Sequence, residues 1–297
     1  MIIINISAGL GNQMFMYAFG RAMSLKHKKA LILDISNLEN DNLRSYGLQH
    51  LFLPKEVKLL SEDQLLEKRC KIKKKVMNIY AKLLGYSYEN INDVLKLNKL
   101  GYFYYSGRKY IPEIRLSNAR ICYFYGMFQC EKYFHEYKEV ICKELKVSEC
   151  VNDFCKNIVQ EMEQENSVCV HIRRGDYLKS KIHNVCGDNY YRDAIEKMES
   201  IVENPRFYIF TDDPEWAKQH YPSEKYRIVS SSNTDYEDLY CMYHCKHFII
   251  SNSTFSWWAQ YLGEAEDKVV IAPERWYNNM DKTETDIYME NWIRIRV

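Results

Sequence analysis

Two neighbouring arginines stand in a charged segment near the middle of the chain, His171–Tyr177, whose sequence is HIRRGDY. An apolar run, Val168–Val170, precedes it and predicts a buried strand, so the charged residues leave the strand at its C-terminal end. In open α/β sheets, ligands bind outside that end of the strands. Because a planar guanidinium matches the oxygens of a phosphate, Arg173 and Arg174, with His171 beside them, predict an anionic ligand.

A second polar segment, Ser251–Trp258 (SNSTFSWW), follows another predicted strand, 247–251. Ser253 and Thr254 would begin a helix, where backbone N–H groups and the positive end of the helix dipole favour a bound phosphate. A simple helix cap, with the two tryptophans packed in the core, is the structural alternative. That alternative leaves unexplained why the same half of the chain holds a second anion-binding pattern. The two segments together therefore predict a diphosphate ligand, with Asn252 among its contacts.

Asp212 and Asp213 follow a third predicted strand, 206–211. Asp213 with Pro214 has the pattern of a helix N-cap followed by proline at the first helical position. Asp212 lies outside that pattern and is expected to face the ligand. The adjacent carboxylates do not form the Asp-x-Asp pattern by which many sugar transferases hold a divalent metal, and the ten cysteines lack metal-ligand spacing. We therefore predict no metal site.

The N-terminal loop 9–13 (GLGNQ) follows a predicted strand, 2–6, and opens a predicted helix, 12–28. Its two glycines, with Asp34 closing the next strand, resemble a dinucleotide-binding fingerprint. Met14 stands where the third glycine belongs, and methionine does not allow the close approach of helix and strand. We therefore predict no dinucleotide cofactor. The loop should instead let a ligand or another chain segment approach the helix N-terminus, through Gly9, Gly11, Asn12 and Gln13.

Strands and helices alternate along most of the chain, which predicts an α/β fold with parallel sheets. In the first half, the predicted elements after the opening helix are a strand at 30–35, a helix at 67–84, a strand at 120–129 and a helix at 131–146. In the second half, the predicted strands are 167–172, 206–211, 226–230, 247–251 and 268–272, and the predicted helices are 189–202, 214–220, 235–245 and 254–264. We expect two Rossmann-like doubly wound domains, 1–155 and 156–297, because a charged stretch at 150–165 separates the two alternating halves.

The formal net charge of +1 argues against a nucleic-acid-binding protein. No apolar run approaches the roughly 20 residues that a membrane-spanning helix needs. Met1 leads directly into a predicted strand, and the cysteines fall in apolar segments as reduced core residues do, so we expect a cytoplasmic protein. The predicted helix 67–84 carries six basic residues between Lys68 and Lys75. Such a helix can attach peripherally to an anionic membrane, here the inner face of the cell membrane; a solvated helix face is the alternative that we favour.

Four blocks of this sequence together resemble the bacterial α-1,2-fucosyltransferases, the family that includes the blood-group H-type enzymes. In chain order the blocks are Gly9–Phe15, His171–Tyr177, Asp212–Trp216 and Ser251–Trp258. The second and fourth are specific in combination, whereas residues 54–118 contribute little. The resemblance implies a metal-free glycosyltransferase of the GT-B type, whose two domains face a cleft. The N-terminal domain would hold most of the acceptor, and the C-terminal domain would hold GDP-fucose.

The resemblance also implies roles for individual residues. Arg173 should bind the β-phosphate, and Asp238 stands where the family has its guanine-contacting acid. The other donor contacts that it implies are His171, Arg174, Asp212, Asn252, Ser253 and Thr254. The reaction would be inverting transfer of L-fucose from GDP-β-L-fucose to the 2-hydroxyl of a terminal β-galactoside in a glycan.

Two questions stay open at this stage. Asp176, beside the arginines, is the first candidate for the general base, and its alternative role is to orient Arg173 or Arg174 through charge-assisted hydrogen bonds. The overall function also has alternatives, namely a GDP-sugar transferase that makes another linkage, or a nucleotide-sugar-binding protein without catalysis.

Overall fold

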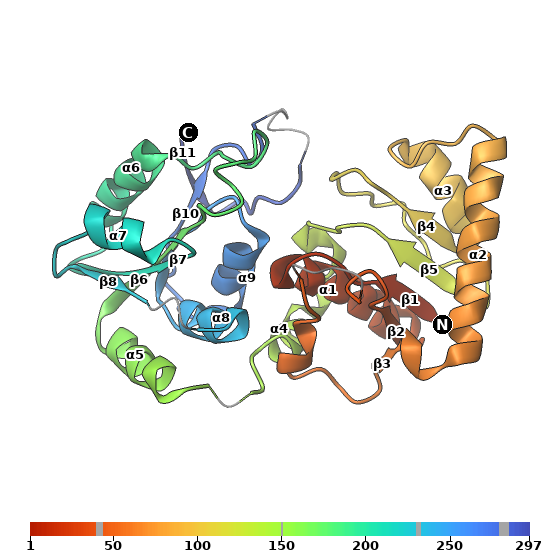
Figure 1. Cartoon of the computed structure of the whole chain (residues 1–297), viewed down its shortest axis with the longest axis horizontal. Helices are drawn as coiled ribbons and strands as arrows, with labels where there is room; N and C mark the ends of the chain where they lie inside the picture. Colours follow the sequence, from red (N-terminus) through yellow and green to blue (C-terminus); the bar gives the residue numbers. More distant parts are fainter. Residues whose placement is uncertain (40–43, 150, 230–232, 279–284) are drawn as a thin grey trace. The chain divides into compact units, whose positions relative to one another are not determined.

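The computed structural model describes residues 1–39, 44–149, 151–229, 233–278 and 285–297. The chain divides into two compact units, Met1–Leu145 and Lys146–Val297 (Figure 1). This division falls before the expected boundary at 155/156, because helix α5 (Asp153–Gln164) packs against α8 (Asp235–Tyr243) of the second unit. Each unit contains one parallel sheet with helices, so the predicted α/β fold with two Rossmann-like halves is confirmed.

The first unit is built on a five-stranded sheet in the order β3-β2-β1-β5-β4. The strands are β1 (Ile2–Asn5), β2 (Leu31–Asp34), β3 (Lys58–Leu59), β4 (Tyr102–Tyr104) and β5 (Cys122–Tyr125), all paired in parallel. Its longer helices are α1 (Leu10–His27), α2 (Gln64–Leu83), α3 (Ile91–Lys99) and α4 (Lys138–Glu144). Short 3₁₀ helices are Leu48–His50, Leu60–Glu62, Glu131–Tyr133 and His135–Tyr137.

The two faces of β1 are covered by different helices, as in a doubly wound sheet. Ile3 packs in a cluster with Leu66 and Cys70 of α2, whereas Ile4 lies against Gly20 of α1. A Cβ added at Gly20 would stand 3.1 Å from Ile4 Cγ2, so this glycine permits the close approach of helix and strand that Met14 cannot provide.

The second unit is built on a six-stranded sheet in the order β11-β10-β9-β6-β7-β8. The strands are β6 (Asn166–Ile172), β7 (Pro205–Thr211), β8 (Tyr226–Ile228), β9 (His247–Ile249), β10 (Val270–Pro273) and β11 (Ile293–Ile295), all paired in parallel. Besides α5 and α8, its helices are α6 (Asp188–Glu199), α7 (Pro214–His220) and α9 (Thr254–Leu262). Counted within the unit, the strand order is 3-2-1-4-5-6, the Rossmann order, in which the chain reverses direction across the sheet between β6 and β9.

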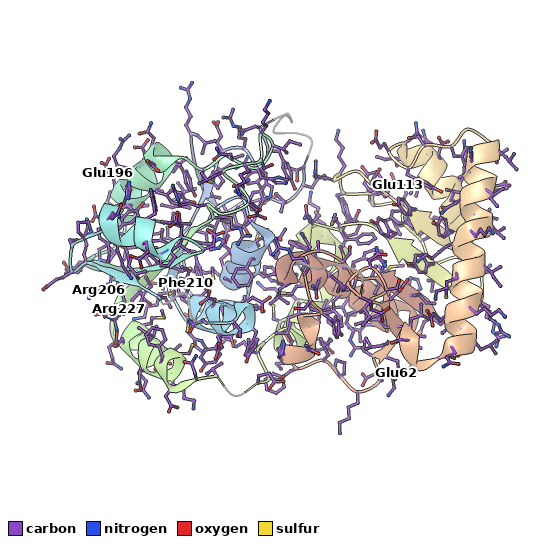
Figure 2. All side chains as sticks on the ribbon, viewed as in Figure 1. Glu62, Glu113, Glu196, Arg206, Phe210 and Arg227 are labelled. Atoms are coloured by element: carbon purple, nitrogen blue, oxygen red, sulfur yellow. The ribbon has the colours of Figure 1, made fainter. Side chains whose placement is uncertain are left out.

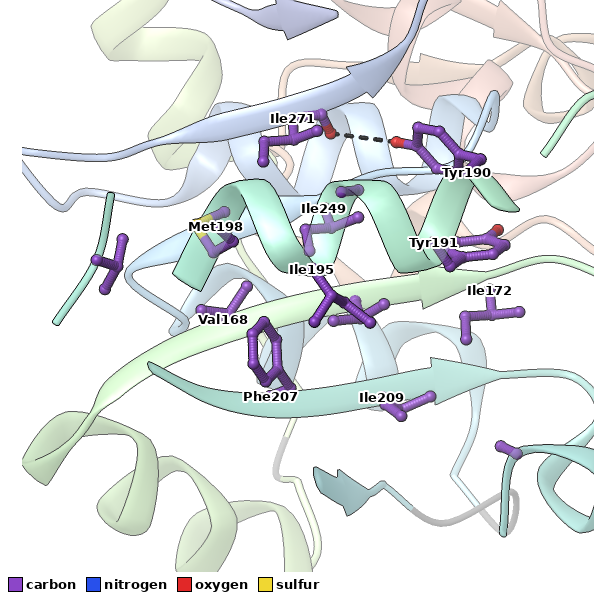
Figure 3. Packing of buried hydrophobic residues seen from close by; sticks show 14 residues of the cluster. Val168, Ile172, Tyr190, Tyr191, Ile195, Met198, Phe207, Ile209, Ile249 and Ile271 are labelled. Carbon is purple, nitrogen blue, oxygen red and sulfur yellow. Dashed lines mark hydrogen bonds between the residues drawn. The ribbon is translucent and has the colours of Figure 1, made fainter. Parts of the chain in front are cut away.

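A hydrophobic core fixes the strands of the second sheet against α6. Tyr190, Tyr191, Ile195 and Met198 of this helix share a buried cluster with apolar side chains of the strands, and Figure 3 shows Ile195 beside residues of β6 and β7 and Tyr190 directed toward Ile271 of β10. All residues of β6 after Asn166 are buried, as expected of a central strand covered on both faces. The strand ends that follow this core are therefore held in fixed positions.

Several elements differ from the sequence prediction. The single helix expected at 131–146 is two 3₁₀ turns followed by the short α4, because Phe134 takes a φ of −136° and packs its ring near that of Phe15. The prediction missed β3, β4, β11, α3 and α5. Ser230, the last residue of the strand predicted at 226–230, lies outside the described residues.

Candidate active site

The two predicted anion-binding segments meet at the reversal point of the second sheet. His171 lies at the C-terminal end of β6, and Ser251 follows the end of β9. His171 Nδ1 and Ser251 Oγ are 2.9 Å apart. Because ligands of open α/β sheets bind outside the strand ends at this point, the contact locates the candidate site.

His171 contributes a hydrogen-bonding group to this site but no positive charge. The residue is only 7% exposed. Burial, with a smaller contribution from the charge of Arg173, lowers the pKa of the imidazole to about 3. The ring is therefore neutral near pH 7, and the positive charge of the site comes from the arginines.

Arg173 is held between two carboxylates at the strand end. Its Nη2 lies 2.7 Å from Asp176 Oδ1, and its Nη1 lies 3.0 Å from Asp212 Oδ2. The ring of Tyr177 lies beside the guanidinium, with 5.6 Å between its centroid and the guanidinium carbon. About a quarter of the Arg173 side chain is exposed, so the guanidinium is fixed in direction and open to a ligand.

Asp212 positions the arginine loop, and its carboxylate is already occupied by that loop. Its Oδ1 accepts hydrogen bonds from the backbone N–H groups of Arg174 (2.9 Å) and Gly175 (3.2 Å), and its Oδ2 pairs with Arg173. A Cβ added at Gly175 would stand 2.8 Å from Asp212 Oδ2, so glycine allows this contact. A carboxylate would also repel a phosphate. Asp212 therefore positions the loop that carries Arg173, and its contact with the donor stays a prediction.

Arg174 turns away from Arg173 and lies against the start of α7. Its Nε is 3.1 Å from Asp213 Oδ2, and its guanidinium carbon lies 3.9 Å from the ring centroid of Trp216. Asp213 accepts a hydrogen bond from the Trp216 N–H and caps α7, with Pro214 in the first turn, as predicted. The stacked Arg174 is thus bound to α7, and its support of a nucleotide stays a prediction.

Asn252 is buried and uses its side chain to join loops. Its Nδ2 donates to the carbonyls of His183 and Trp276, each at 3.0 Å, and its Oδ1 accepts from the thiol of Cys186. Both amide hydrogens have partners within the protein, so the side chain joins these loops, and the contact of Asn252 with the donor stays a prediction.

The start of α9 provides backbone N–H groups near the C-terminal end of β6, the strand that Arg173 and Arg174 follow. Ser253 is the N-cap, and its Oγ accepts a hydrogen bond from the N–H of Phe255. Thr254 is the first helical residue and is partly exposed. The first N–H groups of a helix have no partner within the helix and carry its partial positive charge, so this end suits a phosphate.

Asp238 lies in the first turn of α8, where its carboxylate is largely buried. Burial, together with the neighbouring charges of Asp235 and Glu237, raises the pKa of this carboxyl to about 7, although a hydrogen bond from Asn233 opposes the rise. Near neutral pH this carboxyl is about half ionised. The ionised form can accept hydrogen bonds from the edge of a nucleotide base.

The loop residues of the first unit lie at the corresponding reversal point between β1 and β5. Gly9 is the N-cap of α1, in which Gly11 is a buried residue. Asn12 Oδ1 accepts a hydrogen bond from Gln129 Nε2 (2.8 Å), a residue that follows β5. Gln13 is buried and binds the carbonyls of Ala8 and Ser45 and the N–H of Gly47. Its amide therefore joins loops.

Comparison with known proteins places the chain in a family. The model of glycosyl transferase family 11 matches residues 1–296. The chain belongs to glycosyltransferase family 11. It is 32% identical to an alpha-1,2-colitosyltransferase of Escherichia coli, over 99% of this chain and 98% of that protein. It is 29% identical to the O-antigen biosynthesis glycosyltransferase WbnK of Escherichia coli, over 98% and 99% of the two chains.

Among solved structures, the fold is similar to that of NodZ alpha-1,6-fucosyltransferase soaked with GDP-fucose. The TM-score is 0.53, with 15% identity over 88% of this chain and 91% of that chain. At this identity the likeness concerns the fold alone, and it confirms the predicted GT-B type. Family membership establishes a glycosyltransferase that resembles fucosyltransferases and uses a nucleotide sugar.

Three tyrosines of this family 11 protein hold the site and were missed by the sequence analysis. Tyr190 and Tyr191, from α6, reach the strand ends: Tyr190 donates to the carbonyl of Ile250 (2.5 Å), and Tyr191 donates to that of His171 (3.3 Å). Tyr177 donates to the carbonyl of Asn252 (3.5 Å) and so links the two motifs. The sequence offers one signal for these roles, the aromatic pair Tyr190 and Tyr191 at the start of a predicted helix. The hydrogen-bond partners of the tyrosines are backbone carbonyls, which no sequence motif indicates.

The described part of this family 11 chain shows neither a cluster of metal-binding side chains nor a membrane-spanning helix. Within it, no three His, Cys, Asp or Glu side chains gather into a cluster that could hold a metal ion. None of the described helices is long and apolar enough to cross a membrane.

Proposed function

We propose that this protein transfers L-fucose from GDP-β-L-fucose to the 2-hydroxyl of a terminal β-galactoside, with inversion at the anomeric carbon. The observation that carries the proposal is the meeting of the Arg173 loop with the Ser251–Thr254 segment at the reversal point of the second sheet. The sequence blocks that resemble the α-1,2-fucosyltransferases supply these same residues. The similarity to the O-antigen biosynthesis glycosyltransferase WbnK supports a glycan acceptor.

The donor diphosphate would lie between Arg173 and the start of α9. As the bond to fucose breaks, negative charge grows on the departing GDP, and preorganised positive groups stabilise that charge. The guanidinium of Arg173 and the first N–H groups of α9 are such groups. Asp176 and Asp212 hold the guanidinium in place before the donor arrives, so little reorganisation accompanies the reaction. We propose that these groups act without a metal ion.

Asp176 is proposed to orient Arg173. Its Oδ1 lies 2.7 Å from Nη2 and 3.0 Å from Nε of that arginine, which is the geometry of a charge-assisted pair. About half of the carboxylate side chain is exposed, so a second role as the base that accepts the acceptor proton is the alternative. The pH dependence of an Asp176 variant separates these roles.

A second candidate is transfer of colitose, because the 32% identical relative is an alpha-1,2-colitosyltransferase. Colitose differs from fucose by lacking one ring hydroxyl, so the phosphate-binding groups would act in the same way on both donors. The test is incubation with GDP-fucose or GDP-colitose and a panel of terminal galactosides, followed by linkage analysis of the product.

The expected result of that test is a fucosyl α-1,2 product formed faster than the colitosyl product. Faster colitosyl transfer would overturn the donor assignment, and another linkage would overturn the acceptor position. Tight binding of GDP-fucose without transfer to any galactoside would instead favour a nucleotide-sugar-binding protein.

A further inference from the structure

Helix α2 has two apolar faces, and only one of them packs against the protein. Its inner face places Leu66, Cys70 and Ala81 in a buried cluster with Ile3 of β1 and Tyr102 of β4. Figure 1 shows α2 at the outer side of the first unit, with the sheet on one side of it. Packing on the sheet therefore does not account for the apolar side chains on the opposite side of α2.

The outer face of α2 is a stripe of exposed apolar side chains. Large apolar residues recur there at spacings of three, four and seven, which places them on one side of a helix. We call this the α2 stripe, and its members and their exposed fractions are Leu65 (61%), Ile72 (55%), Val76 (51%), Ile79 (51%), Tyr80 (41%) and Leu83 (79%). Figure 2 shows side chains projecting outward along this helix. Single exposed apolar residues are common on protein surfaces, but a continuous stripe marks an interaction site.

Basic side chains border the α2 stripe. Lysines lie along one edge of the α2 stripe, and an arginine lies among its apolar residues. These exposed basic residues are Lys68, Arg69, Lys71, Lys75 and Lys82. The sole acidic residue within α2, Glu67, already pairs with Lys71.

Two other lysines of this helix serve the fold. Lys73 donates to the carbonyls of Leu100 and Ile121, and Lys74 pairs with Asp34. The basic residues that the sequence groups between Lys68 and Lys75 therefore divide into an outward set and a structural set.

We propose that α2 lies flat on an anionic membrane surface, with the α2 stripe in the interfacial region and the bordering lysines at the lipid phosphates. An exposed apolar face bordered by basic residues is the pattern of interfacial helices. A second copy of this chain fits less well, because the facing helix would offer no unpaired acidic side chain to these lysines. The sequence favoured a solvated helix face, but the structure shows that the outward side is apolar. This proposal does not rest on the proposed function.

The test is flotation of the full-length protein with lipid vesicles. Vesicles of phosphatidylcholine alone are compared with vesicles in which about a third of the lipid is phosphatidylglycerol. We expect roughly tenfold more protein bound to the anionic vesicles, and less binding as salt is raised. The variant Ile72→Gln with Ile79→Gln should lose most of this binding, and so should Lys68→Gln with Lys75→Gln.

A matched control changes the same residue types elsewhere. The variant Lys197→Gln with Lys218→Gln, and the variant Ile201→Gln, alter exposed residues of the second unit and should bind vesicles as the unaltered protein does. Circular dichroism and melting temperature check that every variant is folded.

Three outcomes would overturn the proposal. One is the absence of vesicle binding, and another is equal binding by the unaltered protein and both α2 variants. The third is a concentration-dependent dimer, seen by light scattering, that the Ile72→Gln/Ile79→Gln variant loses while no protein floats with vesicles; that result would assign the α2 stripe to a second copy.

Discussion

Arg173 is the residue on which the account of the reaction chiefly depends. Replacing it with alanine removes a charged donor from the leaving group and leaves Asp176 and Asp212 in a partly exposed loop. Loss of one such donor costs about 3–4 kcal/mol of transition-state stabilisation. We therefore expect Arg173→Ala to lower kcat by roughly a hundredfold or more while the melting temperature changes little.

The matched control for that change is Arg192→Ala, which removes another exposed, ion-paired arginine of the same unit. It should keep normal turnover. Near-normal transfer by folded Arg173→Ala protein would contradict the assignment.

Asp176→Asn distinguishes the two roles of that carboxylate. If Asp176 orients Arg173, the amide still accepts a hydrogen bond, so kcat should fall by about tenfold and the acidic limb of the pH–rate profile should persist. If Asp176 is the base, that limb should disappear and kcat should fall much further. Steady-state rates between pH 5 and 9 decide between them.

Asp238 should make both stability and nucleotide affinity depend on pH. Its pKa is raised to about 7 in the folded protein, above its ordinary value, so between about pH 4 and 7 the folded state binds more protons than the unfolded state. The free energy of unfolding should therefore fall as pH rises through this window, by up to about 4 kcal/mol in total. Asp238→Asn should remove that slope in urea unfolding measured at several pH values.

If the ionised Asp238 accepts hydrogen bonds from guanine, as the family resemblance implies, GDP affinity should change in the opposite direction. It should increase more steeply from pH 6 to pH 8 in the unaltered protein than in Asp238→Asn, where only the ionisation of the GDP phosphate remains. Equal pH dependence in both proteins would exclude Asp238 as the group that titrates.

At the scale of elements, the site depends on loops joined at the ends of β6 and β9. Asn252 ties two of these loops through carbonyls of His183 and Trp276. Asn252→Ala would remove the Asn252 donor from the buried Trp276 carbonyl, whereas the His183 carbonyl would keep its hydrogen bond from the N–H of Val185. We expect a free energy of unfolding lower by about 1–3 kcal/mol in denaturant unfolding. Asn189→Ala, an exposed position on α6, is the matched control and should have little effect.

The sequence predicted those elements that carry a complete local signal. The apolar runs of β6 and β7 and the Asp213-Pro214 cap of α7 were correctly predicted because burial on both faces and capping are local properties. The strands β3, β4 and β11 are two or three residues long, so they have no detectable periodicity. The roles of Asn252 and Gln13 could not be predicted either, because their partners are backbone atoms from distant segments.

At the scale of the whole molecule, the sequence correctly indicated two α/β halves but not the side of α2 that faces outward. Hydrophobic spacing identifies a helix, yet α2 has apolar residues on two faces, and only the packed structure shows which face is buried. The candidate site, in contrast, lies within one unit, and the order of its strands alone brings His171 to Ser251.

The central claim is that Arg173 and the start of α9 hold the diphosphate of the donor nucleotide. Calorimetric titration of the unaltered protein and of Arg173→Ala with GDP and with guanosine, which has no phosphate, tests it most directly. We predict that Arg173→Ala weakens GDP binding by about 10- to 100-fold and leaves guanosine binding unchanged, because a hydrogen bond to a charged group is worth about 1.5–3 kcal/mol. Unchanged GDP binding, or an equal loss for both ligands, would contradict the account.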